Sequence, residues 1–266
     1  MTVGNGPTLN RRSQMLEGLG IGPQWVRRQT DAAPAVQSGP SGPVPLPAAD
    51  TGNVADNPDH TSGPGPGKYG DSDIAAMDWD ALQTAVTTCT RCSLCQSRTR
   101  TVFGVGDPQA SWLFIGEGPG RSEDQQGEPF VGPAGKLLDN MLASMALRRD
   151  RDSFIANVVK CRPTDASGKD RAPNPEEIAA CRPYLARQID LIKPSILVAL
   201  GKTAAVTLLD REPTTAVSSL RGVVHNYGAL PLIVTYHPAY LLRTLVDKRK
   251  SWEDLCLAMD QHASPG

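Results

Sequence analysis

The cysteines are the first residues whose spacing suggests chemistry. Two residues separate Cys89 from Cys92 and Cys92 from Cys95, and Cys161 and Cys181 follow with nineteen residues between them. A zinc knuckle usually has two close C-x2-C pairs, and the second pair here is too wide for that. A long second spacing suits an iron–sulfur cluster held by four thiolates, with Cys95 as a competing choice of ligand.

Two glycine-rich loops are candidates for a binding site. The segment GEGPG over residues 116–120 follows an apolar run and precedes Glu123 and Asp124. Such a turn can offer backbone N–H groups to an anion or a carbonyl. The second loop, GEPFVGPAG over residues 127–135, contains Phe130. This ring is either a plug for the core or an aromatic plate for a flat ligand.

Two polar residues follow or interrupt apolar runs. Asn157 lies in FIANVV, where an amide either ties down a loop or reads the donor and acceptor pair of a ligand. His237 follows LIVTY and precedes a proline, a position from which it could donate a hydrogen bond to developing negative charge. Leu241, Leu242 and Arg243 come next and could enter a base stack and hold a phosphate. Further candidates for phosphate contacts, unless they are only solvated, are Arg98, Arg100, Lys160, Arg162, Lys248, Arg249 and Lys250.

Apolar runs alternate with helical patterns from residue 72 onward. The expected strands cover residues 111–116, 154–159, 195–200 and 232–236. The expected helices cover residues 74–88, 132–147, 175–193, 202–209, 239–246 and 251–262. This alternation predicts an α/β fold with a parallel sheet covered on both faces. Ligands of such sheets bind at the carboxyl ends of the strands, where the polar residues above fall.

The first 70 residues differ in composition from the rest. They hold 22 of the 48 glycines and prolines of the 266-residue chain, which is typical of a disordered tail and linker. Residues 11–28 combine apolar side chains with four arginines. One interpretation is a short motif that docks on a partner protein or on DNA. The other, favoured by the three glycines in this stretch, is a tail with weak local helix.

Composition excludes several classes of protein. The net charge of −1 excludes a histone-like polybasic binder but not a local patch for nucleic acid. No apolar run reaches the roughly 18 residues that a membrane span needs. The N-terminus also lacks the hydrophobic segment of an export signal. We therefore expect a cytoplasmic protein without a membrane partner.

Five motifs together resemble the family 4 uracil-DNA glycosylases, the iron–sulfur members of their superfamily. They are GEGPGRSED, GEPFVGPAGKLLD, NVVKCRP, CRPYL and HPAYLLR, and the match runs from about Cys89 to Trp252. The resemblance implies a three-layer α/β/α sandwich around a short, mostly parallel four-stranded sheet. It places a glycosylase domain at residues 71–266, with the tail over residues 1–70 outside it, and implies a monomer that acts on uracil-containing DNA.

The resemblance also implies the reaction and its cofactor. The reaction is hydrolysis of the N-glycosidic bond of deoxyuridine in DNA, which releases uracil and leaves an abasic site. A [4Fe–4S] cluster with a structural role would be held by Cys89, Cys92, Cys161 and Cys181. His237 would stabilise the negative charge on the leaving uracil, and Leu242 and Arg243 would fill the gap left by the flipped base.

Further roles concern the base and the attacking water. The expected uracil-binding residues are Gly118, Phe130 and Asn157, of which Phe130 would stack on the ring and Asn157 would pair with its edge. The turn that contains Glu117 would place the water. The expected catalytic carboxylates are Glu117 and Glu123, and the sequence leaves open whether one of these or Asp124 guides the water.

Two other functions use the same residues. One is a non-catalytic iron–sulfur protein that binds DNA or senses damage, which would keep the cysteines but lose Asn157 or His237; both are present. The other is a redox protein with a working thiol. A zinc-stabilised version of the fold is distinguished by colour, because a zinc protein is colourless and an iron–sulfur protein is brown.

Overall fold

The computed structural model describes residues 69–264. The expected tail and its motif at residues 11–28 therefore lie outside the described residues, apart from residues 69 and 70. Six strands form one sheet in the order β1-β3-β2-β4-β6-β5. Their bounds are β1 (Val105–Gly106), β2 (Trp112–Gly116), β3 (Ser153–Asn157), β4 (Ile196–Leu200), β5 (Val224–Tyr227) and β6 (Leu230–Thr235).

The sheet has a parallel centre and antiparallel edges. The strands β3, β2, β4 and β6 pair in parallel and correspond to the four expected strands. The expectation of only four strands is wrong, because β1 and β5 add antiparallel edges. Neither edge strand has the apolar run of a buried strand: β1 is two residues long, and β5 alternates between exposed and half-buried residues.

The expected helices surround the sheet with changed boundaries, and two further short helices, at Arg121–Gln126 and Val217–Leu220, were not expected. The helices are α2 (Asp71–Ala76), α3 (Trp79–Thr87), α4 (Arg121–Gln126), α5 (Pro133–Ser144), α6 (Pro175–Ile192), α7 (Lys202–Leu208), α8 (Val217–Leu220), α9 (Pro238–Arg243) and α10 (Lys248–Ala263), with the 3-10 turns η1 (Ser93–Gln96) and η2 (Leu245–Asp247). The single helix expected at residues 74–88 is two helices. The Asp78 carboxylate accepts a hydrogen bond from the Ala81 N–H at 2.9 Å and so begins a new helix.

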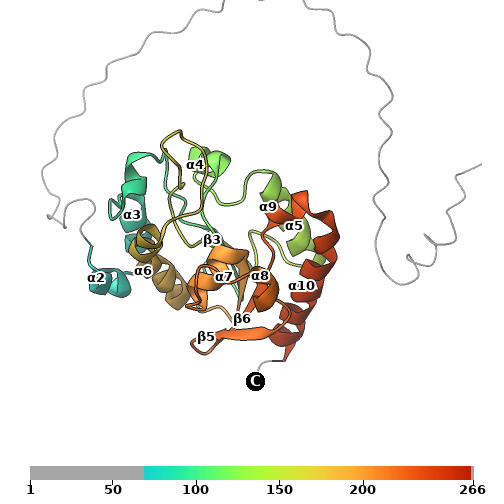
Figure 1. Cartoon of the computed structure of the whole chain (residues 1–266). Coiled ribbons are helices and arrows are strands. Elements are labelled where there is room, and N and C mark those ends of the chain that lie inside the picture. Colours follow the sequence, from blue (N-terminus) through green and yellow to red (C-terminus); the bar gives the residue numbers. More distant parts are fainter. Residues whose placement is uncertain (1–68, 265–266) are drawn as a thin grey trace, which may run out of the picture. The chain divides into compact units, whose positions relative to one another are not determined.

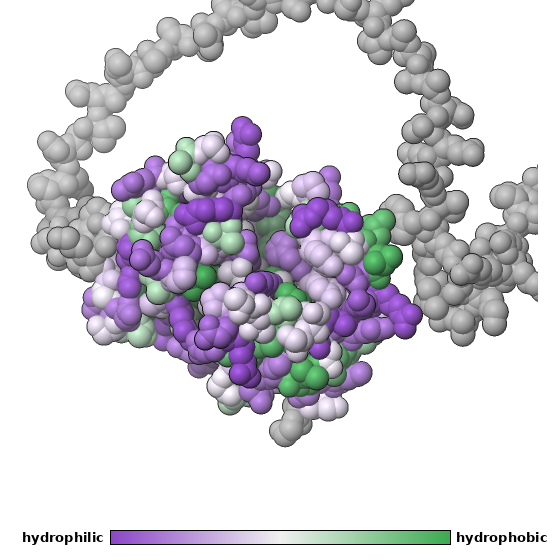
Figure 2. Space-filling model, in the orientation of Figure 1, coloured by the Kyte–Doolittle hydropathy of each residue, from purple (hydrophilic) through white to green (hydrophobic). Residues whose placement is uncertain are grey.

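Alternate side chains of the strands enter two separate cores. Leu113 and Ile115 of β2 pack in one core with residues of α2, α3, α6 and α7. Trp112 and Phe114 pack in the other with residues of α5, α9 and α10. Figure 1 shows α3 and α6 on one side of the molecule and α5 and α10 on the other. The expected three-layer α/β/α sandwich is therefore confirmed. On the face drawn in Figure 2, hydrophilic residues predominate, with smaller hydrophobic areas among them.

The register of the parallel strands brings their carboxyl ends to one edge of the sheet. Gly116 at the end of β2 lies beside Asn157 at the end of β3. Leu200 at the end of β4 lies beside Thr235 at the end of β6. The loops that follow these residues therefore meet above the same edge. None of the described helices has the length and apolar character needed to cross a membrane.

The long helix α6 begins with a reciprocal cap. The Asn174 side chain accepts the Glu177 N–H, and the Glu177 carboxylate accepts the Asn174 N–H, both at 2.8 Å. Arg171 also donates to both oxygens of Glu177, at 2.8 and 2.6 Å. Because α6 contributes residues to both the core and the site described below, loss of its N-terminal cap should lower the stability of the whole domain.

We expect Asn174→Ala to destabilise the protein by about 1 kcal/mol, since it removes one cap acceptor. For a domain of this size that is a fall of about 2–4 °C in the midpoint of thermal unfolding. The matched control is Glu176→Gln, which changes an exposed residue of the same turn. Equal midpoints for the two variants would contradict the contribution assigned to the cap.

Candidate functional site

His237 lies at the carboxyl end of β6 and caps helix α9. Its Nδ1 atom accepts the N–H of Ala239 at 3.1 Å. A neutral imidazole whose Nδ1 is an acceptor carries its proton on Nε2, which is then available as a donor. Burial, together with the nearby positive charge of Arg243, lowers the pKa of His237 to about 4, with Glu123 opposing the shift. The ring is therefore neutral at pH 7.

Phe130 is held beside His237 by its loop. The two rings are stacked, with centroids 5.5 Å apart and planes 27° from parallel. Phe130 is 6% exposed and has a φ of +56°, a conformation that L residues rarely adopt. Its carbonyl lies so close to Gly135 that no side chain fits there. Arg149 donates to the carbonyls of Pro129 and Phe130 at 2.7 and 2.9 Å, which fixes the loop.

Asn157 meets Phe130 above the end of β2. It is 2% exposed, and its Oδ1 atom is buried without a hydrogen-bond partner among the described residues. A Cβ atom at Gly116 would lie 2.5 Å from this Oδ1 and 2.6 Å from Cζ of Phe130. The absence of a side chain at Gly116 thus lets the amide and the ring converge. An unpaired buried acceptor costs free energy and favours a ligand with a donor.

The GEGPG turn packs against the chain that leaves β3. The Glu117 carbonyl accepts the Val159 N–H at 3.2 Å. A Cβ atom at Gly118 would lie 2.7 Å from Cγ2 of Val159, so the turn approaches as closely as only glycine permits. The Glu117 carboxylate accepts a hydrogen bond from the hydroxyl of Thr203 in α7. This contact ties the carboxylate to the first turn of α7.

The other two carboxylates hold neighbouring loops. Glu123 accepts the N–H groups of Val131 and Gly132 at 3.0 and 3.2 Å, and thus supports the loop of Phe130. Asp124 is 3% exposed and accepts the Thr99 N–H at 2.8 Å. These contacts anchor backbone, so a catalytic role for Glu123 stays a prediction.

The two adjacent leucines after His237 differ in exposure, which the sequence alone could not show. Leu241 is 1% exposed and packs in the core with α5 and α10, so its expected insertion into DNA is wrong. Leu242 is 42% exposed, and Arg243 is exposed beside it. The turn that follows is pinned by Tyr240, whose hydroxyl donates to Asp247 at 2.6 Å.

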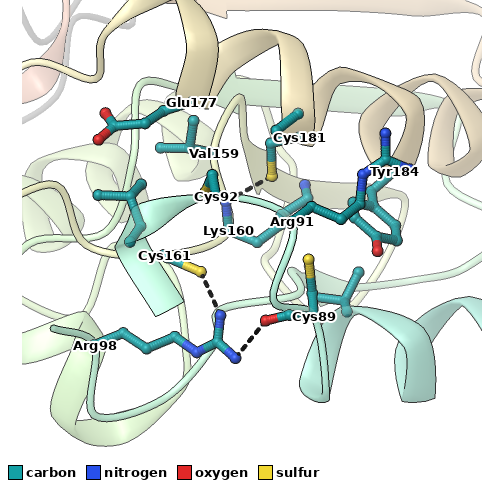
Figure 3. A pocket seen from close by; sticks show the side chains of 13 residues that line it. Cys89, Arg91, Cys92, Arg98, Val159, Lys160, Cys161, Glu177, Cys181 and Tyr184 are labelled. Carbon is teal, nitrogen blue, oxygen red and sulfur yellow. Dashed lines mark hydrogen bonds between the residues drawn. The ribbon is translucent and has the colours of Figure 1, made fainter. Parts of the chain in front are cut away.

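Four cysteines line one small cavity. They come from separate segments: Cys89 and Cys92 flank the loop after α3, Cys161 follows β3, and Cys181 belongs to α6. Figure 3 shows their side chains gathered around a shared space. Cys95 is not among the lining residues, which favours the other four as a ligand set.

The donor set of this cavity is four cysteine sulfur atoms, the kind of ligand that iron–sulfur clusters take. Within residues 69–264, no three or more His, Cys, Asp or Glu side chains are arranged to hold a metal ion. Zinc would need four ligands about 2.0–2.3 Å from one point. Burial raises the pKa of Cys161 to about 11 and that of Cys181 to about 12, so cations are needed to hold them as thiolates. Arg98 contributes one, donating to the Cys161 sulfur at 3.1 Å and to the Cys89 carbonyl at 2.7 Å.

Several expected phosphate contacts have other partners. Lys160 is 1% exposed, and Arg98 lines the cysteine cavity, so neither is a free surface cation. Arg162 pairs with Asp170. The expected cations that remain exposed are Arg100, Lys248, Arg249 and Lys250, of which Arg249 pairs with Glu253 and Lys250 with Asp247. Arg149 and Thr203 were not expected in the site, because their roles depend on contacts far along the chain.

The lowered pKa of His237 predicts how stability depends on pH. The unfolded chain binds a proton at this residue below about pH 6.5, whereas the folded chain does not until about pH 4. Stability should therefore fall as the pH falls from 6.5 toward 4. The midpoint of thermal unfolding should drop more steeply over this range in the parent than in His237→Gln. Parallel curves for the two proteins would refute the shift.

Comparisons with known proteins identify the family. The model of the Uracil DNA glycosylase superfamily matches residues 103–256. A Type-4 uracil-DNA glycosylase of Archaeoglobus fulgidus is 45% identical over 170 residues, which cover 61% of this chain and 82% of that protein. One of Thermotoga maritima is 43% identical, over 62% of this chain and 83% of that protein.

A more distant relative agrees with them. A Type-4 uracil-DNA glycosylase of Pyrobaculum aerophilum is 37% identical over 68% of this chain and 93% of its own length. The matched region contains the parallel sheet and the loops at its carboxyl edge. The chain therefore belongs to the uracil DNA glycosylase superfamily and, within it, to the type-4 uracil-DNA glycosylases.

Proposed function

We infer that this chain is a DNA repair enzyme that hydrolyses the N-glycosidic bond of uracil in DNA, releasing uracil and leaving an abasic site. One observation carries the inference: an unpartnered amide oxygen of Asn157, the ring of Phe130 and the neutral imidazole of His237 converge at one edge of the sheet. Together they offer an acceptor, a flat surface and a donor, which are the contacts that a departing uracil requires.

Asn157 is proposed to select the base. Uracil presents an N–H donor beside a carbonyl acceptor, whereas cytosine presents an acceptor beside an amino donor. The Oδ1 of Asn157 can accept the N–H of uracil while its amide nitrogen donates to the carbonyl. With cytosine both contacts would be mismatched, and a buried mismatch is strongly disfavoured. Phe130, fixed by its loop, would stack on the ring and set its plane.

His237 is proposed to stabilise the leaving group. Glycosidic cleavage passes through an oxocarbenium-like sugar, and the base departs with negative charge. The Nε2–H of the neutral His237 would donate to an oxygen of that base. A preorganised donor of this kind is worth roughly 3–4 kcal/mol. Because Nδ1 is occupied by the Ala239 N–H, the donor is already oriented before the substrate arrives.

Glu117 and the α9 segment are proposed to complete the reaction. The Glu117 carboxylate, oriented by Thr203, would guide the water that attacks the sugar, and Gly118 would let backbone approach the base. Flipping the nucleotide costs a few kcal/mol. Leu242 would fill the vacated space and Arg243 would contact phosphate, which offsets that cost.

The four cysteines are proposed to hold a [4Fe–4S] cluster. Cys89, Cys92, Cys161 and Cys181 supply the four thiolates, and the bound cluster would supply cross-links between segments rather than a reactive centre. This would fix the chain after β3 against α6 and the loop after α3. We further propose that the enzyme works as a monomer on DNA in the cytoplasm.

The proposal is tested with an oligonucleotide that contains one uracil. Protein purified without oxygen should release uracil, so that alkali breaks the strand at that site, while a uracil-free control stays intact. His237→Ala should cut the single-turnover rate by about 100-fold or more, with DNA binding retained.

Three results would count against the proposal. An active parent with near-full activity in His237→Ala would remove the role given to this residue. A brown, folded parent that binds DNA without excision would favour a non-catalytic binding protein, and one whose colour cycles under mild reductant would favour a redox protein.

The ligand set is tested with a matched pair of cysteines. Cys92→Ser should lose the visible absorption and most of the bound iron, because Cys92 lines the cavity. Cys95→Ser should keep both, because Cys95 lies three residues away and outside the lining. Iron per protein and the visible spectrum are measured on both variants. Loss of iron from Cys95→Ser with retention in Cys92→Ser would reverse the assignment.

A further inference from the structure

A lysine with no carboxylate partner is buried between the cysteine cavity and the amide of Asn157. Lys160 is 1% exposed. Its ammonium donates to the Asn157 carbonyl at 2.8 Å and to Oε1 of Gln188 in α6 at 2.6 Å. None of the ion pairs formed by the described residues includes Lys160. A buried ammonium is costly, so its contacts call for an explanation.

The position of the Lys160 contacts within the sheet explains why they form. The edge strand β1 pairs antiparallel with β3, with Val105 beside Ile155. Continued for two residues, this register would place Phe103 beside Asn157, but β1 has already ended there. Gln188 donates to the Phe103 carbonyl at 2.9 Å. The side chains of Lys160 and Gln188 thus form a bridge between Asn157 and Phe103 where strand pairing stops.

The bridge completes the fixation of one peptide group. On the β2 side, the N–H of Val158 donates to the Gly116 carbonyl at 2.9 Å. On the opposite side, the carbonyl of Asn157 accepts the ammonium of Lys160. Both polar atoms of the peptide between Asn157 and Val158 are therefore held, and the amide side chain projects from a fixed backbone.

The backbone of Lys160 is held as firmly as its side chain. Its N–H donates to the Cys181 sulfur at 3.2 Å, and its carbonyl accepts the Val102 N–H at 2.8 Å. Figure 3 shows Lys160 among the residues of the cysteine cavity. The residue thus belongs to the wall of the cavity through its backbone and to the end of β3 through its side chain.

We propose that Lys160, braced by Gln188, is a positioning residue for uracil recognition. It takes the place of the missing strand partner of Asn157 and holds the side-chain amide of Asn157 at the base-binding edge. The inference rests on the proposed function. Lys160 contacts no substrate and acts through Asn157. The bridge also gives the segment between Asn157 and Cys161 a single rigid conformation, so that the cavity and the base-binding edge are built on one stretch of chain.

The test replaces Lys160 by methionine, which has similar length and no donor. Lys160→Met should lower the single-turnover rate on uracil DNA by about 10–100-fold, as expected for a displaced recognition group. Iron and sulfide content should equal those of the parent. The matched control is Lys193→Met, which changes an exposed lysine at the end of α6 and should leave the rate unchanged.

A double-mutant cycle separates positioning from general weakening of the fold. In an Asn157→Ala background, Lys160→Met should have little further effect, because the side chain that it positions is gone. In a His237→Ala background its effect should persist in full. Equal effects in both backgrounds, or loss of iron from Lys160→Met, would overturn the proposal. Should Lys160→Met fail to fold, Gln188→Met removes the brace alone and is read by the same cycle.

One readout does not depend on catalysis. Hydrogen exchange of the Val158 amide should be faster in Lys160→Met than in the parent, because the opposite side of its peptide is released. An unchanged exchange rate would contradict the proposal that Lys160 holds this peptide group. If the parent itself excised no uracil, the proposed function would fail, whereas the exchange measurement would still decide whether Lys160 holds the end of β3.

Discussion

The parallel pairing of β3, β2, β4 and β6 is the constraint on which the rest of the structure depends. Because parallel strands point the same way, each strand delivers its following loop to the same edge of the sheet. Residues separated by more than a hundred positions along the chain, such as Gly116 and His237, thereby become neighbours of one site. A change of register by one residue would turn Asn157 away from Phe130 and would move the buried side chains of β3 to the opposite faces of the sheet.

The site depends on close backbone approach as much as on its polar groups. Gly116 and Gly118 admit neighbours that any side chain would displace. Phe130 keeps an unfavourable backbone conformation because Arg149 and the loop around Gly135 determine it. Strain of this kind persists only where the surroundings fix the residue. Under the proposed function, it keeps an aromatic surface in place before the base arrives.

Much of the fold and several site residues could be predicted from local sequence. The features that could not be predicted depend on contacts between distant parts of the chain or on the phase of a helix. Asn157 and His237 could be found because the first interrupts an apolar run and the second follows one. Gln188, Arg149 and Thr203 could not, since each is an ordinary polar residue of a helix or loop whose partner lies far along the chain. The orientation of the short helix α9 about its axis leaves Leu241 buried and Leu242 exposed. Two adjacent leucines in a sequence do not indicate which of them faces the core. The strand β5 lacks an apolar run because only one side of it is covered.

The unpartnered oxygen of Asn157 has a consequence for turnover. In the proposed pairing, the edge that uracil shows to this oxygen is the same whether the base is attached to DNA or free in solution. The cleaved base would then satisfy the same acceptor and the same ring surface as the substrate. The proposed means of selection thus implies product inhibition, and a stronger hold on this edge would lengthen the time for which each released uracil occupies the enzyme.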